Sequence, residues 1–397
     1  MIPRHLAPKL KKLAQGFPAI FITGPRQSGK TTLARETFPS FKYVSLENPE
    51  NLDFALEDPK GFFKKFEAPC IIDEIQRAPL LLSYLQGLID ESQKPGQWIL
   101  TGSQQFLLME KISQTLAGRL AITQLLPFSL SELMETSPRN PVTTLRELST
   151  IAKPSQNLEE TMIKGFYPRL HTSKLDPKDW YSAYYQTYVE RDVRGVLKIG
   201  DLATFRKFVR LCAGRSGQLV NFSSLAVDAG ISPPTARSWI SVLETSSLIT
   251  LIAPHHGNFN KRLTKSQKLY FLDTGLLCYL LDISHAKDIV SHHLRGAIFE
   301  TFVVSGIFKL FAHHGEKPPL YFWRDHAGHE IDLVVDLGSR LLPIEIKSSR
   351  TILSEFFKTM KWWMGLQKTS HKEGALCYAG EETLKRDFFV VHPWWDF

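Results

Sequence analysis

A glycine-rich segment of nine residues constrains this chain more than any other feature. It matches the pattern G-x-x-x-x-G-K-[ST] at every fixed position and consists of Gly24, Pro25, Arg26, Gln27, Ser28, Gly29, Lys30, Thr31 and Thr32. A short apolar run, residues 19–23, precedes it and predicts a buried strand, and a helix is expected to begin near Lys30. Glycines let backbone N–H groups surround an anion, and the positive end of a helix favours phosphate. The segment therefore predicts a phosphate-binding loop, with Lys30 on the β- and γ-phosphates and Thr31 on Mg²⁺.

Two further apolar runs end in polar residues that suit nucleotide chemistry. The run CIIDE ends in Asp73 and Glu74, and the run WILTGSQ ends in Ser103 and Gln104. Strands that alternate with helices predict a parallel sheet, whose ligand lies at the carboxyl ends of the strands. We expect Asp73 near Mg²⁺, a catalytic Glu74 near an attacking water, and Ser103 near the γ-phosphate. The chain has no Asn-Lys-x-Asp segment for reading guanine, so ATP is favoured over GTP.

One arginine beyond these strands is a candidate for the nucleotide site. Arg119 ends the segment LAGR. An arginine on the γ-phosphate stabilises negative charge in the transition state, whether it belongs to the same chain or to a neighbouring subunit. We expect Arg119 to bind nucleotide in one of these two ways, and a solvated arginine at a helix end is the alternative.

Length and composition fit a protein of several globular domains. The chain has 397 residues, of which 43% are apolar and 22% charged, so about two to four domains are expected and disorder is excluded. Its apolar runs are shorter than the ~18–20 residues of a membrane helix, and no secretory signal is expected at its start. Four cysteines without CxxC spacing favour a reducing cytoplasm over a zinc site or disulfides. We therefore expect a cytoplasmic protein with no membrane partner.

The net charge of +8 is concentrated in the middle of the chain. Residues 186–270 hold 12 Lys and Arg against 5 Asp and Glu. Within them, the pattern predicts helices over residues 223–229 and 233–244, joined by a tight turn and followed by two strands around a basic loop. This is a winged-helix arrangement. The predicted loop holds His255, His256, Lys261, Arg262 and Lys265, and the second helix offers only Thr235, Arg237 and Ser238. DNA binding and a purely structural role both stay open for this unit.

Two late apolar strands bring three ionisable residues together. Residues 330–335 and 341–347 flank Gly338-Ser339, which predicts a hairpin with a type II′ turn. Pairing about that turn places Asp332 opposite Glu345 in a non-hydrogen-bonded pair, with Cβ atoms about 4.5–5.5 Å apart. Pro343 also falls on such a pair, where its missing N–H costs nothing. Lys347 faces the same way as Glu345.

Two facing carboxylates repel each other unless a positive charge lies between them. A divalent cation that prefers oxygen ligands, Mg²⁺ or Mn²⁺, meets that need. Residues 295–304 predict a helix whose Glu300 reaches the same site, so Glu300, Asp332 and Glu345 are the expected metal ligands. Glu345 and Lys347 are the expected catalytic residues, and the lysine can orient or help to deprotonate a metal-bound water for attack on a phosphodiester. The alternative is a surface salt-bridge ladder in which Lys347 neutralises both acids.

Together these motifs resemble a prokaryotic family of AAA-type P-loop ATPases, over nearly the whole chain. The segments IIDEIQ (71–76) and LTGS (100–103) are similar to the ATPase domain of that family. The segments YVERDVR (188–194), KLYFLDTGL (268–276) and EID with EIK (330–332 and 345–347) are similar to its C-terminal half. The resemblance implies a C-terminal PD-(D/E)XK nuclease-like fold, in which Glu300, Asp332, Glu345 and Lys347 match the acid, acid, E-x-K pattern. Glu330-Ile331 replaces the proline that usually precedes the first of these strand acids.

The expected fold class is α/β, with an AAA-type parallel-sheet domain, a helical and winged-helix middle and a restriction-endonuclease-like C-terminal domain. The expected limits are 1–130 for the ATPase domain, 131–200 for a helical lid or linker, 201–285 for the winged-helix-like domain and 286–397 for the nuclease-like domain. The leading hypothesis is an ATP-hydrolysing protein whose nucleotide state controls metal-dependent DNA processing, with DNA and a second copy or another protein as partners. The alternatives are a non-cleaving ATP-driven switch and a DNA-binding regulator with an inactive nuclease-like scaffold.

Overall fold

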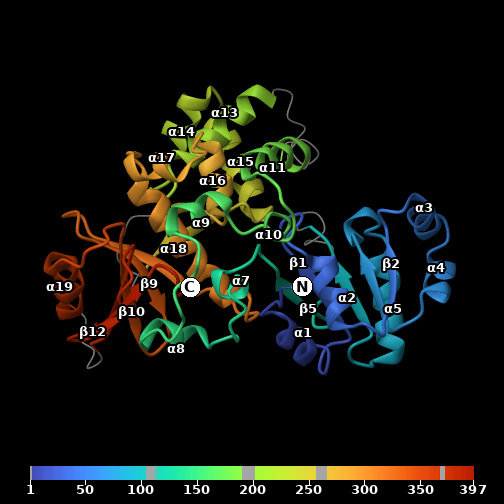
Figure 1. Cartoon of the computed structure of the whole chain (residues 1–397). Helices are drawn as coiled ribbons and strands as arrows, with labels where there is room; N and C mark the ends of the chain where they lie inside the picture. Colours follow the sequence, from blue (N-terminus) through green and yellow to red (C-terminus); the bar gives the residue numbers. More distant parts are fainter. Residues whose placement is uncertain (1, 104–111, 113, 190–201, 256–265, 367–371) are drawn as a thin grey trace.

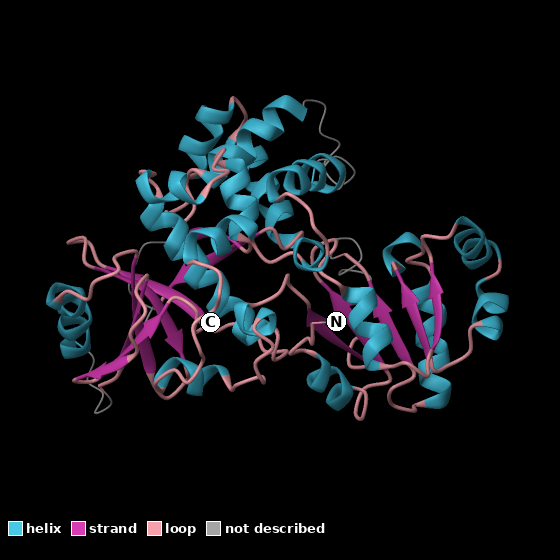
Figure 2. Cartoon of the chain, in the orientation of Figure 1, coloured by secondary structure: helices cyan, strands magenta, loops and turns pink. Residues whose placement is uncertain are grey.

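The computed structural model describes residues 2–103, 112, 114–189, 202–255, 266–366 and 372–397. A parallel sheet with its helices forms one end of the molecule, coloured blue to cyan in Figure 1. A second sheet, coloured orange to red, forms the other end, and a group of helices lies above the region between them (Figures 1 and 2). The chain therefore builds two sheets joined by a largely helical region.

The first sheet has five strands in the order β2-β3-β4-β1-β5, and all of its neighbours are parallel. Its strands are β1 (Ala19–Thr23), β2 (Lys42–Ser45), β3 (Cys70–Asp73), β4 (Trp98–Thr101) and β5 (Leu120–Gln124). Strand β1, which lies between β4 and β5, is buried along its whole length. The predicted parallel sheet is thus confirmed, and its carboxyl edge carries the ends of β1, β3 and β4.

Short helices cover both faces of this sheet (Figure 2). They are α1 (Ala7–Leu13), α2 (Lys30–Thr37), α3 (Pro49–Glu57), α4 (Pro59–Lys65), the 3₁₀ turn η1 (Ile75–Arg77) and α5 (Leu81–Ser92). Two clusters of buried apolar side chains pack between helices and sheet, one on each face. This layering is the usual result of burying both faces of a parallel sheet.

A predicted helical stretch follows the first sheet, and the structure confirms it for the residues described. It contains α7 (Leu130–Leu133), α8 (Pro141–Arg146), α9 (Leu158–Lys164), α10 (Pro168–Thr172), α11 (Pro177–Tyr184) and the π-helical turn η2 (Tyr185–Val189). Asn140, Asn157 and Asp176 cap three of these helices with their side chains. Most of the YVERDVR segment, from residue 190 onward, lies outside the described residues.

The next segment contains three helices, and the second and third are joined by a tight turn, as the sequence predicts. Its elements are α13 (Leu202–Ala213), α14 (Phe222–Ala229), α15 (Pro233–Thr245), β6 (Ile249–Pro254) and β7 (Lys268–Phe271). Gly230 ends α14 with a φ of 78°, and Ser232 caps α15 by accepting a hydrogen bond from Thr235 N at 3.2 Å. Strands β6 and β7 pair antiparallel.

The second sheet takes in these two strands. Its order is β12-β13-β11-β10-β9-β8-β6-β7, and β6 pairs with β8 through Ala253 and Tyr321. The remaining elements are α16 (Thr274–Leu280), α17 (Ala286–Ser291), α18 (Arg295–Ala312), β8 (Leu320–Arg324), β9 (Glu330–Asp336), β10 (Leu341–Lys347), η3 (Ser354–Phe357), α19 (Lys358–Leu366), β11 (Gly374–Tyr378), β12 (Leu384–Arg386) and β13 (Phe389–Pro393). One buried apolar core runs from Phe128 to Phe397. This core includes side chains from both sides of the expected domain limit at 285/286, and the limit itself stays a prediction.

The β9–β10 hairpin has the predicted register. Asp336 pairs with Leu341 and Leu333 with Ile344, and Gly338 in the turn has a φ of 77°. Leu337 N donates to Arg340 O at 3.0 Å, which closes the turn. Asp332 and Glu345 are the next residues outward along the two strands, so the hairpin sets them side by side.

Among the described residues, no helix is both long enough and apolar enough to cross a membrane. All four cysteines are buried and carry free thiols.

Candidate functional site

The glycine-rich segment forms the connection between β1 and α2 at the carboxyl edge of the first sheet. Gly24 has a φ of 143°, and a Cβ at this position would collide with Leu125 O, which follows β5. Gly29 has a φ of 93° and precedes the first turn of α2. Both positions therefore require glycine, which explains the spacing of the motif in physical terms. Ser28 is buried inside the loop, and Thr32 is exposed on α2.

Lys30 and Thr31 start α2 and face the sheet edge. Lys30 Nζ donates to Gly24 O at 3.1 Å and to Pro25 O at 2.8 Å, so its ammonium lies over the loop. Thr31 Oγ1 donates to Asp73 Oδ1 at 2.9 Å. A hydroxyl and a carboxylate in contact at this edge fit the oxygen ligands that Mg²⁺ prefers.

Two partners of Asp73 were not predicted from the sequence. Tyr43, on β2, donates its hydroxyl to Asp73 Oδ2 at 3.1 Å, and Thr101, at the end of β4, donates to Asp73 Oδ1. Their positions follow from the strand order, because β2 and β4 flank β3. A sequence alone does not give that order.

Glu74 follows β3 in a left-handed backbone conformation, with a φ of 60°. Its Oε2 accepts a hydrogen bond from Gln76 Nε2, and the same amide nitrogen donates to Ser103 Oγ at 3.2 Å. Burial raises the pKa of the Glu74 carboxyl, while the charge of Lys30 opposes that shift. The structure thus brings together the predicted Glu74 and Ser103, whereas Gln104 lies outside the described residues.

Arg119 lies at the opposite edge of this sheet, which corrects its expected place at the nucleotide of its own chain. Ala19, the first residue of β1, donates its N–H to Arg119 O at 3.3 Å, and the phosphate loop follows the far end of β1. A five-residue strand is about 15 Å long. The Arg119 guanidinium forms two bonds with Asp90, at 2.5 and 3.0 Å. Contact with the nucleotide of a neighbouring subunit stays a prediction.

Residues outside the first sheet contact the backbone of the phosphate loop. Arg4 Nη1 donates to Ser28 O at 2.8 Å, and Tyr184 Oη donates to Arg26 O at 3.5 Å. Tyr184 is 3% exposed and stacks on Trp180, with ring centroids 5.0 Å apart. No sequence pattern marks Arg4 or Tyr184, because each meets the loop only through the tertiary fold.

A second charged site lies on the hairpin of the C-terminal sheet. Lys347 Nζ lies 2.5 Å from Glu345 Oε1 and 3.5 Å from Asp332 Oδ2. Asp332 Oδ2 also accepts a hydrogen bond from Ile346 N at 2.8 Å. Burial and the nearby Asp332 raise the pKa of Glu345 to about 8. The three predicted residues Asp332, Glu345 and Lys347 therefore share one site.

Glu300 lies near these acids but contacts a different cation. Its Oε1 accepts from Tyr270 Oη at 2.5 Å and lies 3.2 Å from Lys268 Nζ. Lys268 is 4% exposed at its side chain and also pairs with Glu330. The carboxylates of Glu300, Asp332 and Glu330 raise the pKa of this buried ammonium against the opposing effect of burial. Lys268 lies within the KLYFLDTGL segment, which was the only sequence signal for it.

The fit of a divalent cation to this site is partial. Within the described ranges, no three His, Cys, Asp or Glu side chains are grouped so as to hold a metal ion. However, Glu345 Oε2 is buried and has no hydrogen-bond partner among the described residues. Of the three expected ligands, Glu300 therefore pairs with Lys268, while Asp332 and Glu345 pair with Lys347. The Oε2 atom of Glu345 is the carboxylate oxygen that stays without a partner among the described residues.

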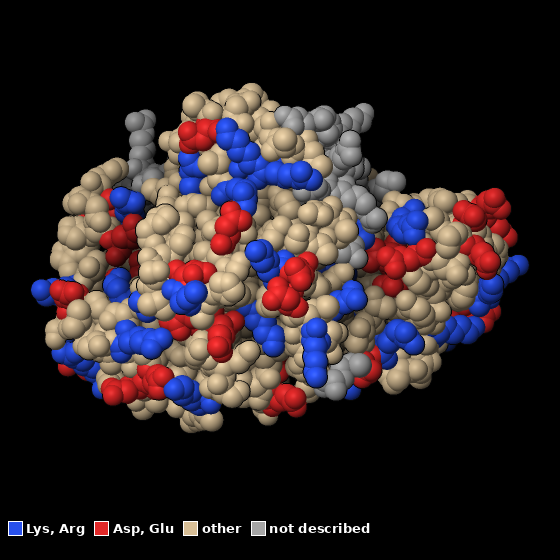
Figure 3. All heavy atoms as spheres, turned by 45° about the horizontal axis from the view of Figure 1, so that its top comes forward, with Lys and Arg blue, Asp and Glu red and all other residues tan. Residues whose placement is uncertain are grey.

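Much of the basic charge in the middle region is ion-paired where the structure describes it. Figure 3 shows Lys and Arg side chains gathered over the helical region. Arg210 lies 2.6 Å from Asp282, and Arg215 pairs with Asp228. Arg237, on α15, lies over the ring of Phe222 at 4.4 Å. Of the predicted basic loop only His255 is described; its Nε2 lies 3.5 Å from Asp336 Oδ2.

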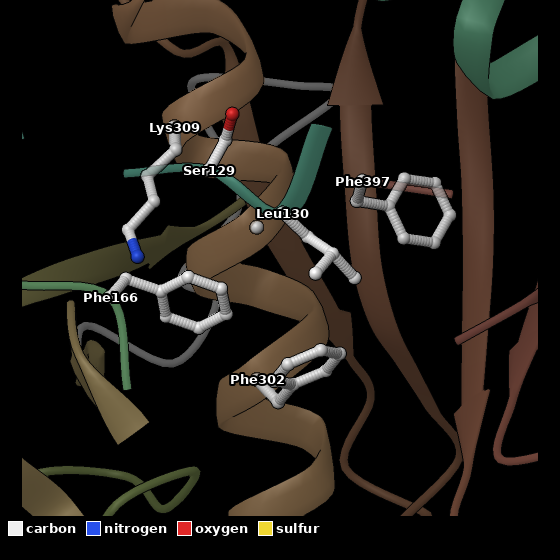
Figure 4. Close-up of a pocket in the computed structure, with 7 residues that line it drawn as sticks. Ser129, Leu130, Phe166, Phe302, Lys309 and Phe397 are labelled. Atoms are coloured by element: carbon white, nitrogen blue, oxygen red, sulfur yellow. The ribbon is translucent and has the colours of Figure 1, made fainter. Parts of the chain in front are cut away.

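A small pocket lies where α18 meets α7 and the C-terminal residue. Ser129, Leu130, Phe166, Phe302, Lys309 and Phe397 line it (Figure 4). Lys309 Nζ is buried, has no hydrogen-bond partner among the described residues and lies 4.0 Å from the ring centroid of Phe166. Burial lowers the pKa of Lys309 to about 8. The pocket is mostly apolar and closed by aromatic rings, so we assign it to the core.

The phosphate loop, the acidic end of β3 and the parallel sheet define an AAA-type P-loop ATPase domain. Residues 16–134 match the family model described as an AAA domain. Residues 155–287 match a domain of unknown function, DUF8612, and residues 295–397 match another, DUF4143.

Much of the chain also matches two uncharacterized proteins. It is 30% identical over 351 residues to the uncharacterized protein Rv2008c of Mycobacterium tuberculosis, covering 88% of this chain and 74% of that protein. It is 27% identical over 289 residues to the uncharacterized protein MJ1637 of Methanocaldococcus jannaschii, covering 64% and 60%. The chain belongs to the same family as the mycobacterial protein.

Two solved structures are similar over much of the chain. The Walker-type ATPase PABY2304 of Pyrococcus abyssi is 15% identical with a TM-score of 0.42, covering 71% of this chain and 96% of that one. AMPPCP-bound DnaA of Aquifex aeolicus is 14% identical with a TM-score of 0.30, covering 60% and 85%.

Proposed function

We propose that this chain is an ATP-hydrolysing switch whose nucleotide state is transmitted to its C-terminal half. The observation that carries this proposal is that side chains outside the first sheet bind phosphate-loop carbonyls, namely Arg4 at Ser28 and Tyr184 at Arg26. A loop that closes around phosphates changes these bonds. Ligand binding and the arrangement of the contacting parts are then coupled in free energy.

Within the ATPase site, five predicted residues have roles that their positions support. Lys30 would bind the β- and γ-phosphates, and Thr31 with Asp73 would hold Mg²⁺, which supplies charge neutralisation when bound. Glu74 would accept a proton from the attacking water, and Ser103 would contact the γ-phosphate. Both lie at the carboxyl edge of the sheet, the same edge as the phosphate loop.

From Arg4, buried polar contacts lead toward the C-terminal half. Arg4 Nη2 donates to Leu126 O at 2.7 Å, and Arg4 Nε lies 3.1 Å from Glu132 Oε1. Glu132 is fully buried, and its Oε2 lies 3.2 Å from His313 Nδ1. Because buried charges pair in few geometries, a shift of Arg4 is expected to displace its partners as well.

Helix α18 connects this network with the acidic site. His313 directly follows the helix, and Glu300 lies near its start. At a rise of about 1.5 Å per residue, the two positions are roughly 20 Å apart along the axis. Helix α18 therefore reaches the Arg4–Glu132 pair at its end, through His313, and Lys268 near its start, through Glu300.

Phosphate release and hydrogen exchange test this proposal together. We expect ATP hydrolysis by the wild-type protein and none by Lys30→Ala, while Glu74→Gln binds ATP without turnover. In Glu74→Gln, ATP should change amide exchange in residues 295–312, and Lys30→Ala is the matched control in which it should not. Arg4→Met should bind ATP and lose the change at α18. Binding of ATP that leaves α18 exchange unaltered in Glu74→Gln would contradict transmission.

A second candidate function is metal-dependent cleavage of DNA at the hairpin site. The specific observation in its favour is the unpartnered, buried Glu345 Oε2 beside Asp332 and Lys347. Asp332 and Glu345 could supply oxygen ligands to Mg²⁺ or Mn²⁺, and Lys347 could orient a water. DNA would reach this site across the winged-helix-like unit formed by α14, α15 and the β6–β7 hairpin.

Incubation with supercoiled, linear and branched DNA tests this second function. Cleavage with Mg²⁺ or Mn²⁺ that disappears in Asp332→Ala and Glu345→Ala would support it. If cleavage persists in both variants, the hairpin site is not its source. If no DNA is cleaved with either metal while ATP is hydrolysed, the protein is a non-cleaving switch.

A further inference from the structure

Gln76 lies beside the proposed catalytic carboxylate, in the middle of η1. Its Nε2 donates to Glu74 Oε2 and to Ser103 Oγ, which is 3.2 Å away. One side-chain amide therefore binds a carboxylate that follows β3 and a hydroxyl that follows β4. These strands are neighbours in the sheet.

The backbone beneath Gln76 fixes the position of this amide. A Cβ on Gly102 would collide with Gln76 Oε1, so glycine leaves the room that the amide fills. Gly102 N donates to Ile22 O at 3.3 Å, which ties this end of β4 to the strand that leads into the phosphate loop. The amide is thereby held at the sheet edge where a γ-phosphate would lie.

We infer that Gln76 is a positioning residue for ATP hydrolysis, which holds Glu74 and Ser103 together so that contact of Ser103 with the terminal phosphate orients Glu74. The inference rests on the proposed roles of Glu74 and Ser103. Neither the motif match nor the family resemblance assigns a role to Gln76.

The donor chemistry of the amide explains how this works. The amide nitrogen carries two N–H donors and no acceptor, and both bonds here use it as the donor. Since Ser103 Oγ accepts from Gln76, its own O–H can donate to a phosphate oxygen, and hydrogen bonds in such a chain strengthen one another. A hydrogen bond donated to Glu74 favours the ionised carboxylate, which is the form that can take a proton from water.

Steady-state kinetics of Gln76→Met test this inference, because methionine keeps the length of the side chain and removes both donors. We expect kcat to fall about 10- to 100-fold with KM for ATP within about twofold, and the acid limb of the kcat–pH profile to move to higher pH. Ser103→Ala should lower kcat as well, and the double variant should lose no more than the larger single effect. Gln97→Met is the matched control, since the Gln97 amide donates to Pro95 O at the other end of β4.

A second variant covers the case in which Gln76→Met fails to fold. In Gln76→Glu the new carboxyl can donate only when protonated, so its kcat relative to wild type should be higher at pH 5.5 than at pH 8. Wild-type kcat in Gln76→Met, or a pH-independent ratio in Gln76→Glu, would overturn the inference. If the wild-type protein releases no more phosphate from ATP than Lys30→Ala does, the proposed ATPase role fails instead.

Discussion

Arg4 and Glu132 form a buried ion pair, although 128 residues separate them in the chain: Arg4 Nε lies 3.1 Å from Glu132 Oε1. Their side chains are 8% and 0% exposed. Glu132 N also donates a hydrogen bond to Ser129 Oγ at 3.2 Å, and Ser129 N donates to Glu132 Oε2 at 3.0 Å in return, so the acid is held from both sides. Arg4 contacts the phosphate loop at Ser28 O, and Glu132 contacts His313 at the end of α18. The pair therefore links the start of the chain to both.

Glu132→Gln should destabilise the protein strongly. Removing one member of a buried ion pair leaves the other charge without compensation, at a cost of about 3–5 kcal/mol. We expect a loss of this size in the free energy of unfolding, measured by urea denaturation. Asp387→Asn serves as the control, because its pair with Lys361 is half exposed and its loss should leave the unfolding midpoint unchanged.

The same pair predicts a pH dependence. Burial by itself would raise the pKa of Glu132, but the charges of His313 and Arg4 hold this pKa well below 4.5, its ordinary value. A carboxyl with a lowered pKa in the folded state stabilises the fold above the unfolded pKa and loses that contribution as the pH falls. At pH values below about 4.5, the urea midpoint of unfolding should therefore fall more steeply with decreasing pH in the wild-type protein than in Glu132→Gln. Parallel curves for the two proteins would show that Glu132 does not carry this dependence.

Lys268 is expected to be the main cation that stabilises the C-terminal acids. Its ammonium pairs with Glu300 and Glu330, and burial together with Asp332 raises the pKa of Glu300. Lys268→Met should cost about 3 kcal/mol in unfolding free energy, because it leaves buried carboxylates unpaired. Adding Glu300→Gln should recover part of that loss, and a double-mutant cycle measures the coupling. Strictly additive losses would mean that Lys268 and Glu300 do not interact in solution.

The sequence predicted the local parts of both sites and missed their long-range partners. The β9–β10 register followed from Gly338 and Pro343, since turn type and strand period are encoded within a few residues. Lys30, Thr31 and Asp73 followed from contiguous motifs in the same way. Lys268 and Arg4 were missed because their partners are distant in sequence, and no local pattern encodes such a pairing.

The place of Arg119 shows the same limit. Its position depends on the strand Leu120–Gln124, which begins one residue later and runs parallel to β1. Without that strand, Arg119 was expected to bind nucleotide, with a solvated arginine at a helix end as the alternative. Once β5 is known, the parallel pairing puts Arg119 at the amino edge of the sheet.

Lys309 should destabilise the fold at neutral pH. Its pKa falls from 10.5 to about 8 on burial, so folding must remove a proton or bury a charge. We expect Lys309→Met to raise the free energy of unfolding by about 1–3 kcal/mol at pH 7. The unfolded state binds more protons than the folded state between about pH 8 and 10.5, so wild-type stability should rise across that window and the advantage of the variant should shrink. An advantage that stays constant with pH would point to packing instead.

Arg119→Ala should leave ATP hydrolysis unchanged at protein concentrations at which the chain is a monomer. The reason is geometric: Asp90 holds the guanidinium at the amino edge of the sheet, and the phosphate loop lies at the carboxyl edge. If Arg119 acts on the nucleotide of a neighbouring subunit, kcat of the wild-type protein should rise with protein concentration and that of Arg119→Ala should not. Mixing Arg119→Ala with Lys30→Ala then gives the sharper test, because a Lys30→Ala subunit can supply Arg119 to a neighbour whose own phosphate loop is intact. A rise in activity above that of Arg119→Ala alone that occurs only on mixing assigns Arg119 to the neighbouring site, and a loss of activity in dilute Arg119→Ala would contradict the placement found here.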